Sequence, residues 1–418
     1  MTILDRKRSF DHLSLLPGEV PFDIAEMFFS RTDERGVIQA CNGVFRRVSG
    51  YEWAQMRGAP HKIVRHPDMP KGVFWLFWQV LKSGQPIGAY VKNRSADGRF
   101  YWVFAVAAPS NDGYVSVRLK PTSPLHGKVI ALYEDLLADE QDGLTPEQSA
   151  GRLQQRIAEM GYTNYANFSS VALMTEMREQ LSRTERSPES WQHRFLTMSD
   201  AIMQVQVETS EMLHAFRTIR TVPMNMRILA SRLENAGGPI SAISINYGAM
   251  LDEMTAWVHA FSHGKDSPFA RIRDSIFTGQ FLACAAALQV QMAQRFGRQT
   301  SSLTNDEIDV PGESARLRQQ ALDYRKRAAE ALKVVELEAG NLARSVLDMN
   351  RYVTGLSSTR MMCKIESAAL EDSGEALAGI VHQLDYCQQA IETHLARISE
   401  MNGLIQSNTA MLRATSQA

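Results

Sequence analysis

The sequence of 418 residues lacks an excess of charge of either sign. Its 45 Lys and Arg residues balance 46 Asp and Glu residues, which leaves a formal net charge of -1. A chain without a global basic field has no long-range attraction to nucleic acid or to an anionic membrane surface. We therefore expect its partners to be proteins or small molecules, and no nucleic acid.

Cysteine is scarce, and none of the four cysteines belongs to a Cys-x-x-Cys pair. This absence argues against a structural zinc site. It also argues against a disulfide-stapled scaffold, because the chain is long enough for two or three ordinary domains, each with its own core. Sparse cysteine usage is typical of a reducing compartment. The four are Cys41, Cys284, Cys363 and Cys387.

Long hydrophobic runs are missing as well. The first twenty residues contain basic side chains but no apolar run of signal-peptide length. The most apolar later window, residues 277–290, is short and contains Gln280, whereas a spanning helix needs roughly 18 apolar residues. We expect a cytoplasmic protein without a membrane segment.

Aromatic residues and proline disappear towards the end of the chain. No Phe or Trp follows Phe296 and no proline follows Pro311, while Ala, Leu, Arg, Glu and Gln dominate. This composition predicts long helices. Apolar residues recur there at steps of three and four, both in residues 314–353 and from Leu384 to Ile405. Such spacing predicts an all-helical bundle or coiled coil.

The N-terminal part shows strand patterns instead. Residues 27–32 and 37–41 flank the turn sequence DERG, which predicts a β-hairpin. Three short helical patterns follow at residues 42–51, 52–58 and 69–84. Three further strands, separated by turns that contain Asp-Gly, are predicted at residues 88–94, 99–109 and 114–120. This order predicts an α+β domain, an antiparallel five-stranded sheet with helices on one face.

Specific motifs lie within this α+β part. They are VSGY at 48–51, VRHPDMP at 64–70, KNR at 92–94 and the pair Tyr101-Trp102. With these motifs, residues 22–121 resemble the PAS sensor domains of bacterial aerotaxis receptors. That family binds FAD without a covalent bond in a cleft between sheet and helices, and reads redox state or oxygen through it. The resemblance therefore implies FAD as the cofactor here.

The resemblance also implies which residues bind the cofactor. Matched position by position, they are Asn42, Arg65, His66, Asp68, Trp78 and Asn93. An Arg can pair with a phosphate in a bidentate manner, and Asn or His can hydrogen-bond to a flavin ring edge. Two features depart from the family. Ile87 stands where the family usually has Trp, and the family's basic KNRRKNG turn is reduced to KNRSADG at residues 92–98. Nothing matches the photoreactive cysteine motif of light-sensing PAS relatives, because Cys41 is in a different register.

The helical part resembles the signalling hairpin of chemotaxis receptors in degenerate form. Two stretches, residues 225–238 and 364–381, each match the hairpin tip that contacts the chemotaxis kinase and its adaptor. The predicted organisation has four parts. They are an N-terminal cap (1–21), the PAS domain (22–121), a helical linker (122–196) and a helical output domain (197–418).

Catalytic motifs are absent, since the sequence has no phosphate-binding Gly loop and no nucleophile elbow. His259 and His263 are spaced for one helix face, but the Glu of an HExxH site is missing. We therefore predict a non-enzymatic, homodimeric redox or oxygen sensor that signals to the chemotaxis kinase, its adaptor or another regulator. Two alternatives stay open: a cofactor-free interaction scaffold, and a PAS domain that binds another ligand such as haem.

Overall fold

A computed structural model describes residues 18–231, 237–264, 266–298, 308–369 and 374–417. Of the predicted N-terminal cap, only residues 18–21 lie inside the described part. The chain forms two compact units. The first comprises the described residues up to Glu189 together with those from Phe277 to Ala328, and the second comprises Ser190–Ile276 and the described residues from Ala329 onward.

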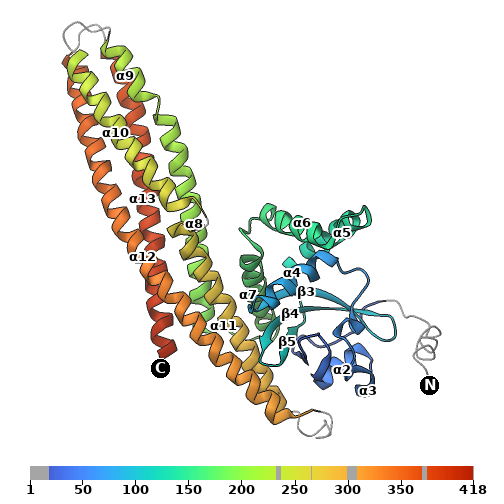
Figure 1. The fold of residues 1–418 in the computed structure, drawn as a ribbon. Coiled ribbons are helices and arrows are strands. Elements are labelled where there is room, and N and C mark those ends of the chain that lie inside the picture. Colours follow the sequence, from blue (N-terminus) through green and yellow to red (C-terminus); the bar gives the residue numbers. More distant parts are fainter. Residues whose placement is uncertain (1–17, 232–236, 265, 299–307, 370–373, 418) are drawn as a thin grey trace. The chain divides into compact units, whose positions relative to one another are not determined.

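The first unit contains an antiparallel sheet of five strands in the order β2-β1-β5-β4-β3 (Figure 1). The strands are β1 (Phe28–Thr32), β2 (Ile38–Cys41), β3 (Ile87–Arg94), β4 (Phe100–Ser110) and β5 (Gly113–Leu119). All five predicted strands are confirmed. The first hairpin turns where the sequence predicts it, and Gly36 there has a φ of 78°, which suits a residue without Cβ.

Helices of the first unit cover both faces of the sheet. Between β2 and β3 lie α2 (Gly43–Ser49), α3 (Trp53–Met56), the 3-10 helix His61–Val64 and α4 (Lys71–Lys82). After β5 come α5 (Pro124–Gln141), α6 (Pro146–Glu159) and α7 (Tyr165–Arg183). On the face opposite α4, the α7 side chains Tyr165 and Ser169 hydrogen-bond to the backbone of Gly88 in β3.

Two further helical segments pack on that opposite face. They are the part of α11 (Pro268–Arg298) from residue 277 and the part of α12 (Val310–Ala369) up to residue 328, which we call the outer helix pair. The Phe296 ring lies 5.0 Å from the Phe29 ring of β1, and Arg31 Nε donates to Glu313 Oε1 at 2.8 Å. The structure therefore differs from the predicted division, because part of the predicted output domain packs against the sheet.

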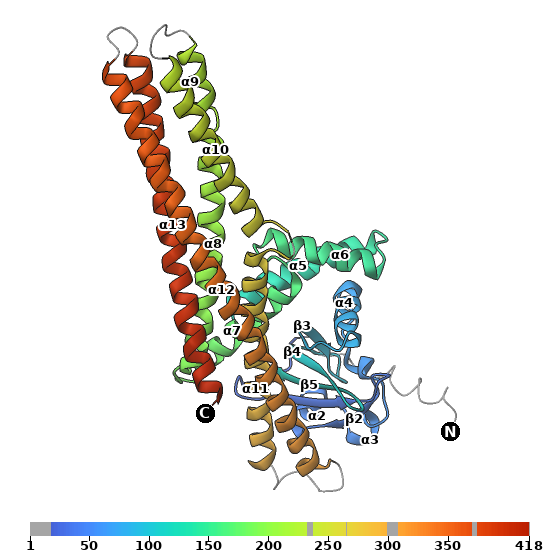
Figure 2. The ribbon, with the colours of Figure 1, turned by 60° about the vertical axis from the view of Figure 1, so that its left-hand side comes forward.

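Within the second unit, long helices run side by side (Figures 1 and 2). They are α8 (Ser190–Ile219, continued by α9, Val222–Ala230), α10 (Gly237–Ser262), the rest of α12 and α13 (Gly374–Gln417). The first and last of them are antiparallel, since Arg194 contacts Asn408 and Glu208 contacts His394. The predicted helical bundle is confirmed. Part of both tip-like stretches (225–238 and 364–381) lies outside the described residues, including Glu234, which the resemblance matches to a position of the receptor tip.

One helical segment in the described part of the chain, Pro268–Phe296, is long and apolar enough to cross a membrane. The mean hydropathy of its most apolar window is 1.3, and 72% of that window is buried inside the structure. Its Gln280 donates to the backbone oxygen of Ser170 in α7, and Ser170 donates back to the oxygen of Phe277. A mostly buried helix in a protein core meets the same length and hydropathy criteria, so these two properties do not identify a membrane helix.

Candidate ligand-binding site

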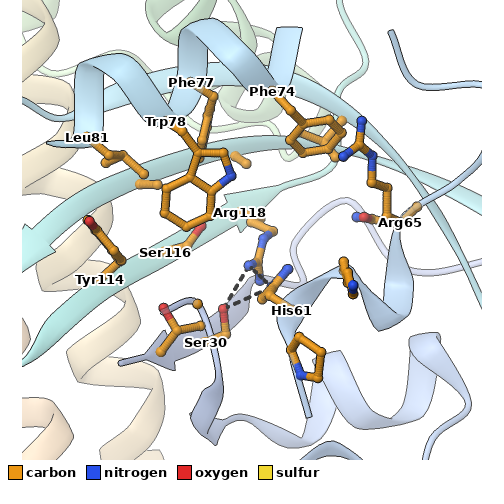
Figure 3. Close-up of a pocket in the computed structure, with 18 of the residues that line it drawn as sticks. Ser30, His61, Arg65, Phe74, Phe77, Trp78, Leu81, Tyr114, Ser116 and Arg118 are labelled. Carbon is orange, nitrogen blue, oxygen red and sulfur yellow. Dashed lines mark hydrogen bonds between the residues drawn. The ribbon is translucent and has the colours of Figure 1, made fainter. Parts of the chain in front are cut away.

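A cavity of about 360 Å³ lies between α4 and the adjacent face of the sheet (Figure 3). This volume falls in the range of about 300 to 1,000 Å³ that is usual for small-molecule sites. We call it the main cavity. Its walls combine aromatic and aliphatic side chains with a few polar groups, which is the usual character of a ligand site. The walls include Ser30, His61, Arg65, Phe74, Phe77, Trp78, Leu81, Asn93, Tyr114, Ser116 and Arg118.

Three of the polar groups form a buried cluster on one wall. Arg118 Nη2 donates to Ser30 Oγ at 2.7 Å and to His61 Nε2 at 2.7 Å (Figure 3). A guanidinium can only donate, so His61 must accept through Nε2 and carry its proton on Nδ1. Burial and the neighbouring Arg118 charge lower the pKa of His61 to about 3. The imidazole is therefore neutral at physiological pH.

The guanidinium of Arg118 is buried without a counter-anion. The residue is 5% exposed, and no acidic side chain forms an ion pair with it in the described ranges. Its Nη1 has no hydrogen-bond partner, and the same is true of Ser116 Oγ nearby on β5. Burial lowers the pKa of Arg118 to about 10, so the group is still charged at neutral pH. A buried cation with a free donor is costly unless something negative or electron-rich meets it.

A second hollow adjoins the main cavity and shares Lys62 and Arg65 with it. Its cationic residues are Lys62, Arg65, Lys71 and Arg94, and we call it the basic groove; His66 also lines it. The rest of its lining comes from α5 and from the segment before α4: Leu137, Glu140 and Gln141 of α5, and Pro67 and Met69. A concentration of Lys and Arg next to an apolar cavity favours a ligand that has an anionic arm, because phosphate oxygens accept charge-assisted hydrogen bonds.

The structure brings four of the six predicted site residues to these two hollows. Arg65, Trp78 and Asn93 line the main cavity, while Arg65 and His66 line the basic groove. The guanidinium carbon of Arg65 lies 4.0 Å from the centre of the Phe74 ring, which fixes its direction by a cation–π contact. Burial lowers the pKa of Arg65 and of His66.

Asn42 and Asp68 lie outside the lining of both hollows. Asn42 is fully buried and opens α2, where its Oδ1 accepts from the amides of Phe45 and Phe29 and its Nδ2 donates to the oxygen of Met27. Asp68 is 57% exposed at its side chain and forms an ion pair with Lys92 at 2.9 Å. That hydrogen bond from Lys92 lowers the pKa of Asp68. Their predicted cofactor role stays a prediction.

Other predicted features lie elsewhere. Ile87 is 2% exposed and is not among the lining residues of the main cavity. The rings of His259 and His263 are 4.3 Å apart in the second unit. Within the described ranges, no group of three or more His, Cys, Asp or Glu residues could hold a metal ion.

Sequence reasoning missed Arg118, His61 and Ser30. The signal for Arg118 was present in the strand sequence YVSVRL, where Val115, Val117 and Leu119 alternate with more polar residues. In a strand, alternate residues face opposite sides, and an Arg in a strand buried on both faces needs a partner or a ligand. For His61 the sequence carries no comparable signal, because it lies in a one-turn 3-10 helix.

Two comparisons with known proteins agree with this geometry. Residues 38–117 match the family model for the PAS fold. The chain is also 42% identical over 114 residues to the aerotaxis receptor of Escherichia coli (strain K12). That match covers 26% of this chain and 22% of the receptor, so the likeness spans about a fifth of the receptor's length and is confined to one region.

Proposed function

Because the N-terminal domain is a PAS domain related to that of an aerotaxis receptor, we propose that this protein is a sensory signal transducer whose main cavity binds FAD. In this proposal the redox state of the flavin, set by oxygen or by the electron supply of the cell, is the signal. The helical second unit is the output part and contacts a protein partner. We propose that the protein acts as a cytoplasmic homodimer without enzymatic activity.

The observation that carries the proposal is the buried Arg118 guanidinium, which has a free Nη1 in an aromatic-lined cavity. A bound flavin supplies reversible electron uptake on a ring whose edge presents carbonyl oxygens and ring nitrogens. Arg118 offers that ring edge a fixed positive charge, and Ser116 offers a hydroxyl without another partner. A flavin ring edge would give both buried groups the hydrogen-bond partner that they otherwise lack.

The other walls of the cavity fit the same ligand. Trp78, Phe74 and Phe77 of α4 present aromatic surface to it, and Tyr114 of β5 lies 5.2 Å from Trp78, measured between ring centres (Figure 3). Aromatic faces of this kind bind a planar ring by stacking or edge contacts. The basic groove next to it suits the pyrophosphate arm that distinguishes FAD from riboflavin. Arg65 faces both hollows and is the residue best placed to hold ring and phosphate together.

The output partner is proposed on the resemblance of the helical part to a receptor signalling hairpin. The chemotaxis kinase or its adaptor is the first candidate and another regulator is the second. Exposed apolar side chains near one end of the bundle, among them Met224, Ile228 and Ile365, support a protein-binding role.

The test is a visible absorption spectrum of the freshly purified full chain, followed by heat release and identification of the chromophore. Oxidised-flavin bands with FAD in the supernatant are expected. Arg65→Ala should weaken FAD binding about 10- to 100-fold, because it removes a charge-assisted contact. Arg57→Ala, at an exposed position of the same domain, is the matched control and should bind FAD as the wild type does.

Two other outcomes would support the alternatives. A protein that stays colourless after incubation with FAD would support the cofactor-free scaffold. A Soret band would support haem, although Nε2 of His61 is engaged by Arg118 and His66 lies outside the main cavity.

A further inference from the structure

Helix α4 carries much of the cavity wall, yet it begins without a cap of its own. Phe74, Phe77, Trp78 and Leu81 all come from this helix of twelve residues. The residue before it is Pro70, which makes no side-chain hydrogen bond to the first turn. The first amides of a helix have no partner inside the helix, so α4 depends on another element for its N-terminus.

Glu140, near the end of α5, supplies the missing cap. Its Oε2 accepts from the Lys71 amide at 2.9 Å, and its Oε1 accepts from the Gly72 amide at 2.9 Å. Ser149 of α6 donates its hydroxyl to the same Oε1 at 2.7 Å. A carboxylate at a helix N-terminus satisfies free amides and also interacts favourably with the helix dipole. The beginning of α4 is thus held by a residue 69 positions later in the chain.

The packing around Gly72 makes this contact tight. A Cβ at position 72 would lie 2.4 Å from Ser149 Oγ and 2.6 Å from the amide nitrogen of Ala150. Only glycine fits there, and α6 therefore rests directly on the first turn of α4. Displacement of α5 and α6 would both uncap α4 and loosen its N-terminal turn.

Glu140 also faces the ligand-binding side. It lines the basic groove together with Arg65, and its negative charge raises the pKa of Arg65 against the effect of burial. One carboxylate therefore connects three things: the helix that forms the cavity wall, the arginine that faces both hollows, and the helices that follow the PAS domain.

We propose that Glu140 is a positioning residue for the flavin site, and that its contact with α4 reports whether the site is occupied. This inference rests on the proposed function. A closed Glu140 contact holds α4 and Arg65 in the arrangement that binds the flavin. By thermodynamic reciprocity, a flavin that binds this arrangement better must stabilise the contact in return. Occupancy of the cavity is thereby linked to the α5–α6 hairpin.

The first test compares FAD affinity in full-length variants freed of flavin. Glu140→Gln keeps the shape but loses the charge and one strong acceptor, and should raise the Kd for FAD roughly 3- to 30-fold, the range expected from loss of a cap. Glu134→Gln, at an exposed position on the same helix, is the matched control. It should leave the Kd within about twofold.

The second test reads the contact itself. Hydrogen exchange at the Lys71 and Gly72 amides, which donate to Glu140, should slow when FAD is added to the wild-type protein. In Glu140→Gln at least one of these two amides loses its acceptor and should exchange quickly with or without FAD. If Glu140→Gln does not fold, Ser149→Ala can replace it, because this variant removes only the hydrogen bond from Ser149 to Glu140. It should raise the Kd for FAD and speed the exchange of the two amides by smaller factors.

The outcomes separate this inference from the function on which it rests. A wild-type protein that binds FAD but shows equal exchange at both amides with and without it would overturn the inference, as would a Glu140→Gln protein with wild-type affinity. A wild-type protein that takes up no flavin would instead overturn the proposed function, and the coupling with it.

Discussion

Arg118 provides the sharpest test, because the structure predicts that its substitution weakens binding strongly and changes stability little. Replacement by Met keeps an unbranched side chain of similar length and removes the charge. In the ligand-free protein this substitution relieves the burial of an unpaired cation. In the flavin-bound protein it removes the only group in the cluster that brings a positive charge to the cavity wall.

The expected change in stability follows from two opposing contributions. Burial lowers the pKa of Arg118 from its usual range to about 10, and a fall of this size corresponds to about 3 kcal/mol of unfavourable free energy for the charged form. Against this gain, Arg118→Met loses the hydrogen bonds to Ser30 and His61, worth about 1.5 kcal/mol each, the lower end of the range for a charged donor. The two contributions nearly cancel, so the free energy of unfolding should change by less than about 2 kcal/mol.

Binding should change much more than stability. A hydrogen bond from a charged donor contributes about 1.5 to 3 kcal/mol, so the Kd for FAD should rise roughly 10- to 100-fold. Arg118→Lys keeps the charge and should lose less affinity than Arg118→Met. Urea unfolding by tryptophan fluorescence is a suitable assay of stability, because four of the six tryptophans lie in the first 121 residues. Unchanged FAD affinity in Arg118→Met would refute the reasoning, as would a loss of about 2 kcal/mol or more in stability.

Three further predictions concern the same unit. The pKa of His61 is about 3 in the folded protein and 6.5 in the unfolded chain. Between pH 7 and pH 5 the imidazole therefore takes up a proton in the unfolded chain but not in the folded protein. The free energy of unfolding should fall by about 2 kcal/mol over this range. Urea titrations should show a smaller fall in His61→Gln. Asn42→Ala loses a helix cap and two longer-range hydrogen bonds and should cost about 3 kcal/mol of stability; where the variant is still folded, an unchanged Kd for FAD would show a structural role. Arg31→Ala leaves the Glu313 carboxylate buried and without its arginine partner, and should lower the free energy of unfolding in urea by about 3 to 5 kcal/mol. The double variant Arg31→Met with Glu313→Leu should leave this free energy nearly unchanged. An equal decrease in the single and the double variant would contradict this account.

The PAS domain was predictable because its signals are local. The turn at residues 33–36 contains Asp-Glu-Arg-Gly, and the Asp33 carboxylate accepts from the amides of Arg35 and Val37, as such turns require. The Asn42 side chain caps α2 by accepting a hydrogen bond from the amide of Phe45, three residues later. These interactions lie within a few residues of each other, so the order of side chains is enough to predict them.

The site was predictable only in part, because its remaining contacts join distant positions. Arg118 and His61 are 57 residues apart, and Glu140 reaches Lys71 across 69 residues. The helical patterns also carried no information on packing partners. An Ala-rich amphipathic helix has the same spacing whether it faces a bundle or a sheet, and only the structure shows that Phe296 meets Phe29.

Strand β1 joins the cavity to the outer helix pair. Successive residues of a strand face opposite sides of a sheet. Ser30 therefore accepts from Arg118 in the main cavity, while Phe29 and Arg31 contact Phe296 and Glu313 on the other face. A closely packed strand cannot move one row of side chains without the other. A shift of β1 caused by a change at Arg118 therefore also moves its contacts with α11 and α12, and both helices continue along the chain into the second unit.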